Sequence, residues 1–183
     1  MLIDLQDIIG RIKNGDQAAF RIIVEKYKQQ AFSLAFRILC DEEEARDIVQ
    51  DSFLRIWQKI DTYKMDAKFS TWMFRIVANR AIDRVRQMKR HDMVKLDKVA
   101  GTIDLLKKDQ IMEEISNAEI AGLIRWLAEG LPEKQHMVFV LRDIQGLDSE
   151  EVQHILDMSD TSVKSNLYHA RATIREKLLR ELK

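Results

Sequence analysis

Residues 148–178 read DSEEVQHILDMSDTSVKSNLYHARATIREKL and carry the clearest structural pattern in the chain. Asp148, followed three residues later by Glu151, forms a capping-box pattern, which predicts that a short helix starts here. The tetrapeptide at 157–160 has the length of a tight turn between two helices. The residues after it alternate between an apolar stripe and a polar face at helical spacing. The stretch therefore predicts a helix-turn-helix.

The second helix of this pair has two distinct faces. Its apolar stripe consists of Val163, Leu167, Ala170, Ile174 and Leu178. The side chains that project elsewhere are rich in hydrogen-bond donors: Lys164, Ser165, Tyr168, His169, Arg171 and Arg175. Such residues near a helix start suit entry into a DNA major groove and contact with phosphates. Many helical bundles have the same spacing of apolar residues, so the pattern alone favours DNA binding without establishing it.

The strongest amphipathic pattern lies upstream, between Asp41 and Ile60. Its apolar positions are Ala45, Ile48, Val49, Phe53, Ile56, Trp57 and Ile60. A polar loop at 61–68 follows, and then a helix that ends in the basic run 84–90. Trp72 and Phe74 in that helix are expected in the core, because aromatic residues at helical spacing usually pack inside.

Composition supports an all-α fold. The 183 residues include only 6 Gly and 1 Pro, fewer than the turns of an all-β protein need, and 46% are hydrophobic. The helical patterns weaken from about Val94 to Ser116. We therefore expect two small helical domains, residues 1–94 and 117–183, joined by a linker at 95–116.

The net charge of zero conceals strongly charged segments. Residues 41–51 contain six acidic residues and one arginine, whereas residues 75–90 contain six basic residues and one aspartate. Residues 131–160 carry a net charge of −5, and residues 161–183 carry +4. Each segment alone could be an ordinary solvated helix face. Together they indicate separate acidic and basic surfaces.

Two blocks of the sequence together resemble the extracytoplasmic-function (ECF) sigma factors, small members of the sigma-70 family. Within residues 41–90, DEEEARDIVQDSFLRIWQKI and FSTWMFRIVANRAIDRVRQMKR resemble the family's second conserved region. Residues 131–178, which read LPEKQHMVFVLRDIQGLDSEEVQHILDMSDTSVKSNLYHARATIREKL, resemble its fourth. The resemblance implies a protein that binds core RNA polymerase, recognises −35 and −10 promoter elements and helps to melt the DNA.

The resemblance also assigns residues. In the family, the helix face that carries the DIVQD motif binds core polymerase. Here the resemblance implies that this surface consists of Asp47, Gln50, Asp51, Leu54 and Gln58. The −10 surface would include Tyr63, Lys64, Lys68, Asn79, Arg80, Asp83, Arg84 and Arg86. The −35 surface would include Thr161, Ser162, Lys164, Ser165, Tyr168, His169, Arg171 and Arg175. An acidic polymerase face repels DNA and favours a basic partner.

Four positions depart from the family pattern. Asn166 and His169 stand where many members carry Arg, Gln153 replaces an Ala, and Arg46 replaces an acid. The promoter sequence therefore does not transfer from the family. The resemblance also implies an inhibitory anti-sigma factor, which in many members is anchored in the membrane.

The sequence gives little support for metal binding or catalysis. The four His residues are scattered, and neither a phosphate-binding loop nor a nucleophile motif occurs, so we expect no metal, no cofactor, no small-molecule substrate and no enzyme activity. Cys40 is expected to pack as a small apolar residue at a helix end. The lone Cys and the absence of long apolar stretches favour a cytoplasmic protein.

Two other functions stay open at this point. A helix-turn-helix regulator that acts without core polymerase would leave the DIVQD face unexplained. A helical adaptor that makes only protein contacts would leave both basic segments unexplained.

Overall fold

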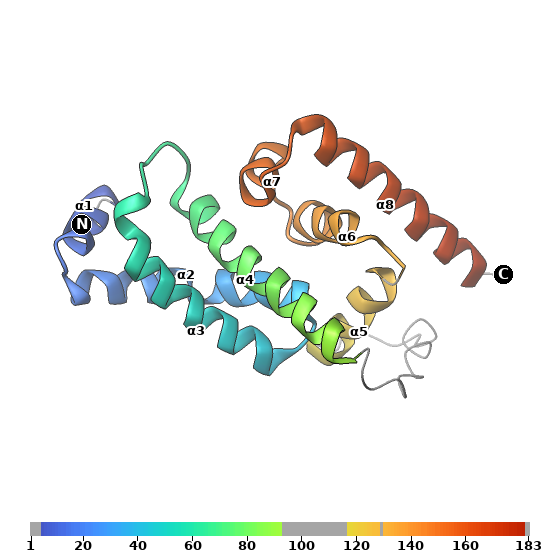
Figure 1. The fold of residues 1–183 in the computed structure, drawn as a ribbon, viewed down its shortest axis with the longest axis horizontal. Helices are drawn as coiled ribbons and strands as arrows, with labels where there is room; N and C mark the ends of the chain where they lie inside the picture. Colours follow the sequence, from blue (N-terminus) through green and yellow to red (C-terminus); the bar gives the residue numbers. More distant parts are fainter. Residues whose placement is uncertain (1–4, 93–116, 129, 182–183) are drawn as a thin grey trace, which may run out of the picture.

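The computed structural model describes residues 5–92, 117–128 and 130–181. These residues form helices and include no strand, as the composition predicts (Figure 1). The predicted linker at 95–116 lies outside the described residues. None of the described helices is both long and apolar enough to cross a bilayer.

The N-terminal part contains four α-helices and a short 3-10 helix. They are α1 (Leu5–Lys13), α2 (Gln17–Leu39), α3 (Glu42–Lys59), η1 (Ile60–Thr62) and α4 (Phe69–Asp92). The side chains of Asp16 and Asp41 cap α2 and α3 by accepting backbone hydrogen bonds of 3.0 Å from Ala19 and Glu44. Cys40, between α2 and α3, adopts a left-handed backbone and is buried.

The core of this part lies between α2, α3 and α4, which pack along one another. Its fully buried side chains include Ile23, Leu34, Ile56, Phe69, Met73 and Val77. Phe69 anchors an aromatic cluster, with its ring 5.2 to 5.7 Å from those of Tyr27, Tyr63 and Trp72. This cluster fixes the start of α4 against the loop that precedes it.

The C-terminal part is a smaller group of helices. Its elements are α5 (Asn117–Ala128), α6 (Glu133–Phe139), the π-helical segment η3 (Val140–Ile144), α7 (Ser149–Leu156) and α8 (Asp160–Glu181). Asp148 and Glu151 form the predicted capping box. Asp157 adopts a left-handed conformation with φ 54°, and the Ser159 hydroxyl accepts from the Ser162 amide. The predicted helix-turn-helix is confirmed.

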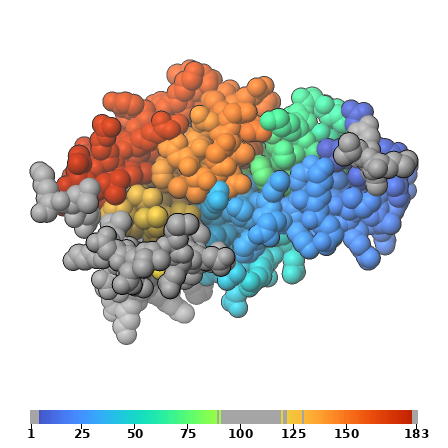
Figure 2. Space-filling view, turned by 180° about the vertical axis from the view of Figure 1, so that it is seen from behind, coloured from blue at the N-terminus to red at the C-terminus, as the bar shows by residue number. Residues whose placement is uncertain are grey.

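The two parts of the chain lie against each other. Helix α7 packs on α4 (Figure 1). The segment η3 packs on α2. From behind, the orange C-terminal helices directly adjoin the blue and green N-terminal ones (Figure 2). The sequence pattern does not predict this arrangement.

Candidate functional site

The outer face of α3 presents the predicted acidic surface. Asp47, Gln50, Asp51, Leu54 and Gln58 are all exposed, whereas Ala45, Ile48, Phe53 and Ile56 are buried beneath them. Leu54 is 57% exposed. The helix therefore offers an apolar side chain surrounded by acidic and amide groups, a composition suited to a basic protein partner.

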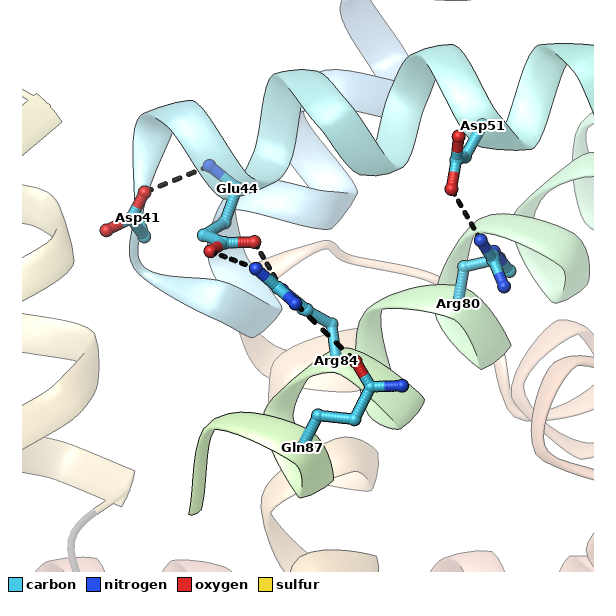
Figure 3. Close-up of polar contacts among 6 residues, drawn as sticks. All are labelled: Asp41, Glu44, Asp51, Arg80, Arg84 and Gln87. Atoms are coloured by element: carbon cyan, nitrogen blue, oxygen red, sulfur yellow. Dashed lines mark hydrogen bonds and ion pairs between the residues drawn. The ribbon is translucent and has the colours of Figure 1, made fainter. Parts of the chain in front are cut away.

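A groove of about 310 Å³ separates this surface from α4. Glu44 accepts two hydrogen bonds from Arg84, of 2.5 and 2.6 Å, and Asp51 accepts one of 2.5 Å from Arg80 (Figure 3). The hydrogen bonds from Arg84 to Glu44 raise the pKa of that guanidinium. Two arginines of the predicted −10 surface are thus tied to acids of the neighbouring helix.

The other predicted −10 residues of α4 share one side of the helix. Asn79, Asp83 and Arg86 are exposed and line a cleft of about 440 Å³ between α4 and the C-terminal helices. Lys64 and Lys68, in the loop before α4, are also exposed. The structure therefore gathers amide, carboxylate and basic groups beside one cleft.

Tyr63 does not belong to that surface. Its side chain is only 5% exposed, its ring packs on Phe69 and Trp72, and its hydroxyl donates a 2.7 Å hydrogen bond to the Ala67 carbonyl. The prediction that Tyr63 contacts DNA disagrees with this placement, because burial keeps the ring from reaching a nucleic acid.

Helix α8 carries the predicted −35 residues on an open face. Thr161, Lys164, Ser165, Tyr168, His169, Arg171 and Arg175 are exposed, and Ser162 is half-buried. The Tyr168 side chain is 72% exposed and stacks edge-on with the His169 ring. A groove of about 520 Å³ runs between Lys164, Tyr168, Arg171 and Arg175.

Two basic residues on this face of α8 are paired with acidic residues. Arg171 donates hydrogen bonds of 2.6 and 2.8 Å to Asp143 of η3, which raise the pKa of its guanidinium. Lys164 pairs with Asp160 at 2.6 Å, and Asp160 also accepts from Ser149 and Gln153 of α7. Asp160 thereby links the two helices of the helix-turn-helix, and these contacts lower its pKa.

Most of the acids that pair with these basic residues were not predicted from the sequence. Glu44, Glu133, Asp143 and Glu151 each pair with a predicted DNA contact. Asp160, four residues before Lys164, and Asp83, three residues before Arg86, pair at helical spacing that the sequence shows. Among the described residues, no group of three or more His, Cys, Asp or Glu side chains is placed to hold a metal ion.

Known protein families match both parts of the chain. The sigma-70 region 2 family matches residues 23–91, which include α3 and most of α4. The sigma-70 region 4 family matches residues 121–174, which include the helix-turn-helix. Both ranges lie inside the predicted domains, whose boundaries stay predictions.

Curated relatives match nearly the whole chain. The ECF RNA polymerase sigma factor SigW of Bacillus subtilis (strain 168) is 35% identical over 177 residues, which cover 93% of this chain and 94% of SigW. The ECF RNA polymerase sigma-E factor of Salmonella typhimurium (strain LT2) is 30% identical over 181 residues, with 94% of this chain and 93% of that one covered. This chain is an ECF sigma factor of the sigma-70 family.

Solved structures share the fold of this sigma factor. CnrH, in complex with the cytosolic domain of CnrY, matches with a TM-score of 0.66 at 23% identity, over 93% of this chain and 94% of CnrH. The sigma factor RpoE of Bartonella quintana, in complex with the anti-sigma factor NepR, also gives 0.66, at 19% identity, over 87% of this chain and 96% of RpoE. The family supports transcription initiation with core RNA polymerase over a regulator that acts without it.

Proposed function

We propose that this sigma factor binds core RNA polymerase through α3, the −10 element through α4 and the loop before it, and the −35 element through α8. Initiation is the function of its family. The observation that carries the residue assignment is the outer face of α3, where all five predicted polymerase contacts are exposed on one side of the helix.

On the −10 surface we assign Asn79, Asp83 and Arg86, together with Lys64 and Lys68. Amide and carboxylate groups can bond base edges of an opened strand, and basic groups bind its phosphates. Arg80 and Arg84 would contact DNA only by leaving Asp51 and Glu44. We leave Tyr63 out because its side chain is buried.

On the −35 surface we assign the exposed side chains at the start of α8 to base edges and Arg171 and Arg175 to phosphates. The first group comprises Thr161, Ser162, Lys164, Ser165, Tyr168 and His169. This division follows the usual placement of a recognition helix, whose N-terminal residues meet the bases in the major groove.

The same proposal includes the cellular location of the protein and its inhibitor. It works in the cytoplasm beside its polymerase and catalyses no reaction itself, since the catalytic centre belongs to the polymerase. We infer that an anti-sigma factor inhibits it, because CnrH and RpoE, which share its fold, are bound to CnrY and NepR in their structures. Isolation of the tagged protein from cells should recover that inhibitor.

Reconstituted transcription tests the proposal. Purified sigma factor and core polymerase from the same organism are incubated with a library of genomic promoter fragments, and the transcripts are sequenced. We expect transcripts that start at a common −35/−10 pair and that core polymerase alone does not produce. Specific initiation from no fragment, with inhibitors absent, would contradict the proposal.

A further inference from the structure

Gln153, one of the four positions that depart from the family pattern, belongs to the helix before the recognition helix. It is half-buried on α7, and its side-chain amide donates a 3.3 Å hydrogen bond to Oδ1 of Asp160, the first residue of α8. The hydroxyl of Ser149, one turn earlier on α7, donates to the same oxygen at 3.0 Å. The alanine that Gln153 replaces could not make its contact. Two side chains of α7 therefore fix the position of Asp160.

The second oxygen of Asp160 faces along the recognition helix. Oδ2 lies 2.6 Å from Nζ of Lys164, one turn later on α8. The hydrogen bonds from Lys164 and Ser149 lower the pKa of the Asp160 carboxyl, so it stays charged beside the lysine. The Lys164 side chain is 71% exposed, and a lysine that exposed otherwise samples many rotamers. A carboxylate fixed from another helix restricts where its ammonium group lies.

The pair of Lys164 and Asp160 offers DNA a directed donor instead of a free positive charge. The Lys164 ammonium has three N–H groups, and one of them is taken by Asp160. The other two can donate to acceptors on a base edge, such as O6 and N7 of guanine. The adjacent carboxylate repels phosphates, so the pair attracts the DNA backbone less than a free lysine does. Lys164 is therefore suited to reading a base.

A second departure from the family pattern makes this lysine more important. Asn166 stands where many members carry Arg, and its amide donates a 2.8 Å hydrogen bond to the Ser162 carbonyl of its own helix. The amide is thus used within α8. Sequence readout near the start of α8 then depends more strongly on where Lys164 points.

We propose that Gln153 is a specificity-determining positioning residue for −35 recognition: without touching DNA, it holds Asp160 in the orientation that aims Lys164 at one base pair. This inference rests on the proposed −35 surface. Ser149 supports the same carboxylate, so loss of Gln153 alone leaves Asp160 partly held, and loss of both side chains frees it from α7. The expected effect is selective, because contacts from α8 to the phosphates do not depend on this network.

The test uses small truncations on α7. Gln153→Ala removes the amide and leaves a residue that favours helix, so α7 should stay folded. The double variant Ser149→Ala/Gln153→Ala removes both donors to Asp160. His154→Ala is the matched control, since His154 is an exposed neighbour on α7 and makes none of the contacts described above. Urea unfolding of each variant checks that the domain remains stable.

Specificity is measured with the holoenzyme on duplexes in which each base pair of the −35 element of a transcribed promoter is replaced in turn. Lys164→Ala identifies the position that the lysine reads, because the preference for one base is lost there. Gln153→Ala should reduce the preference at that position several-fold and leave the other positions unchanged, and the double variant should reduce it further. His154→Ala should leave the whole profile unchanged. In a Lys164→Ala background, Gln153→Ala should have no further effect on specificity.

Three results would overturn this inference. Equal weakening of every duplex by Gln153→Ala, with a lower salt slope, would mean that Gln153 binds a phosphate itself. An unchanged profile, or the same change with and without Lys164, would mean that Gln153 does not act through the lysine. A Lys164→Ala profile that keeps every preference would remove Lys164 from base readout and the positioning role with it. Failure of the proposed function is recognised separately, since the parent holoenzyme would then transcribe no promoter.

Discussion

The guanidinium of Arg86 and the carboxylate of Glu133 meet at 2.6 and 3.0 Å although 47 residues separate them in the sequence. Glu133 is well placed at the first residue of α6, where a helix start favours an acid. The same kind of pairing recurs across the proposed DNA surfaces. The pairs are Lys68–Glu151, Arg80–Asp51, Arg84–Glu44, Lys164–Asp160 and Arg171–Asp143. A chain with no net charge can therefore carry two proposed DNA-binding surfaces, since each of these six cations is paired with an acid of the same chain.

Replacing Arg171 and Arg175 by Ala should weaken binding of the holoenzyme to −35 duplex DNA and leave binding to core polymerase unchanged. Each lost phosphate contact should lower the slope of log K against log salt by about 0.9. The measurement is a salt titration of duplex binding beside a polymerase pull-down. The control is Arg180→Ala, which lies farther along α8 and pairs with Glu176. Equal losses in both assays would indicate a misfolded domain.

Asp47→Lys should weaken core polymerase binding about tenfold or more, because it places a cation where a basic partner is expected. The variant should keep its stability, since Asp47 is exposed and the Ala45–Ile48 side of the helix remains buried. Asp61→Lys is the control, an equal charge change at an exposed position in η1. Affinity is measured by competition with a labelled sigma factor. Equal affinity of Asp47→Lys and the parent would remove α3 from the polymerase surface.

The sequence predicted the features that depend on local chemistry. Asp148 caps a helix as expected, because a short side chain before an amphipathic run satisfies the first backbone amides. The exposed face of α3 and the stripe of α8 followed from helical periodicity alone.

The sequence could not predict what depends on tertiary packing. The pairing of Arg86 with Glu133 has no local signal, because any acid of the second domain could have served. Tyr63 lies in a polar loop and was expected at the surface, yet its ring is drawn into the cluster around Phe69 by aromatic burial. The closed arrangement of the domains likewise depends on contacts far apart in the chain.

Asp148→Ala should destabilise the helix-turn-helix by about 1 kcal/mol, because the Glu151 amide loses its 2.8 Å hydrogen bond and the capping box opens. Asp148→Asn should recover most of that loss, since Asn caps equally well. Urea unfolding followed by circular dichroism measures the difference. Glu150→Ala, an exposed neighbour, is the control. A loss in Asp148→Ala no larger than that in Glu150→Ala would mean that the cap contributes nothing to stability.

Cys40 should be an unreactive thiol in the folded protein. Burial raises the pKa of Cys40 from its ordinary 9.0 to about 11, and only the thiolate reacts with iodoacetamide. At pH 8 the native protein should be alkylated far more slowly than the urea-unfolded chain. Rapid native alkylation with ordinary thiol pH dependence would show that Cys40 is accessible and could act as a redox sensor.

The raised pKa of Cys40 also fixes the direction of a stability effect. Because the folded state holds the proton more tightly, the contribution of Cys40 to stability is fully present below about pH 9 and is lost as pH rises through about 11. Between these values the unfolded chain releases the proton first, so unfolding becomes easier. Other groups titrate in the same window, and Cys40→Ala separates them from the thiol. The urea midpoint should therefore fall between pH 8 and pH 10 by more in the parent protein than in Cys40→Ala. Equal falls in the two proteins would show that the thiol has the same pKa in the folded and unfolded states.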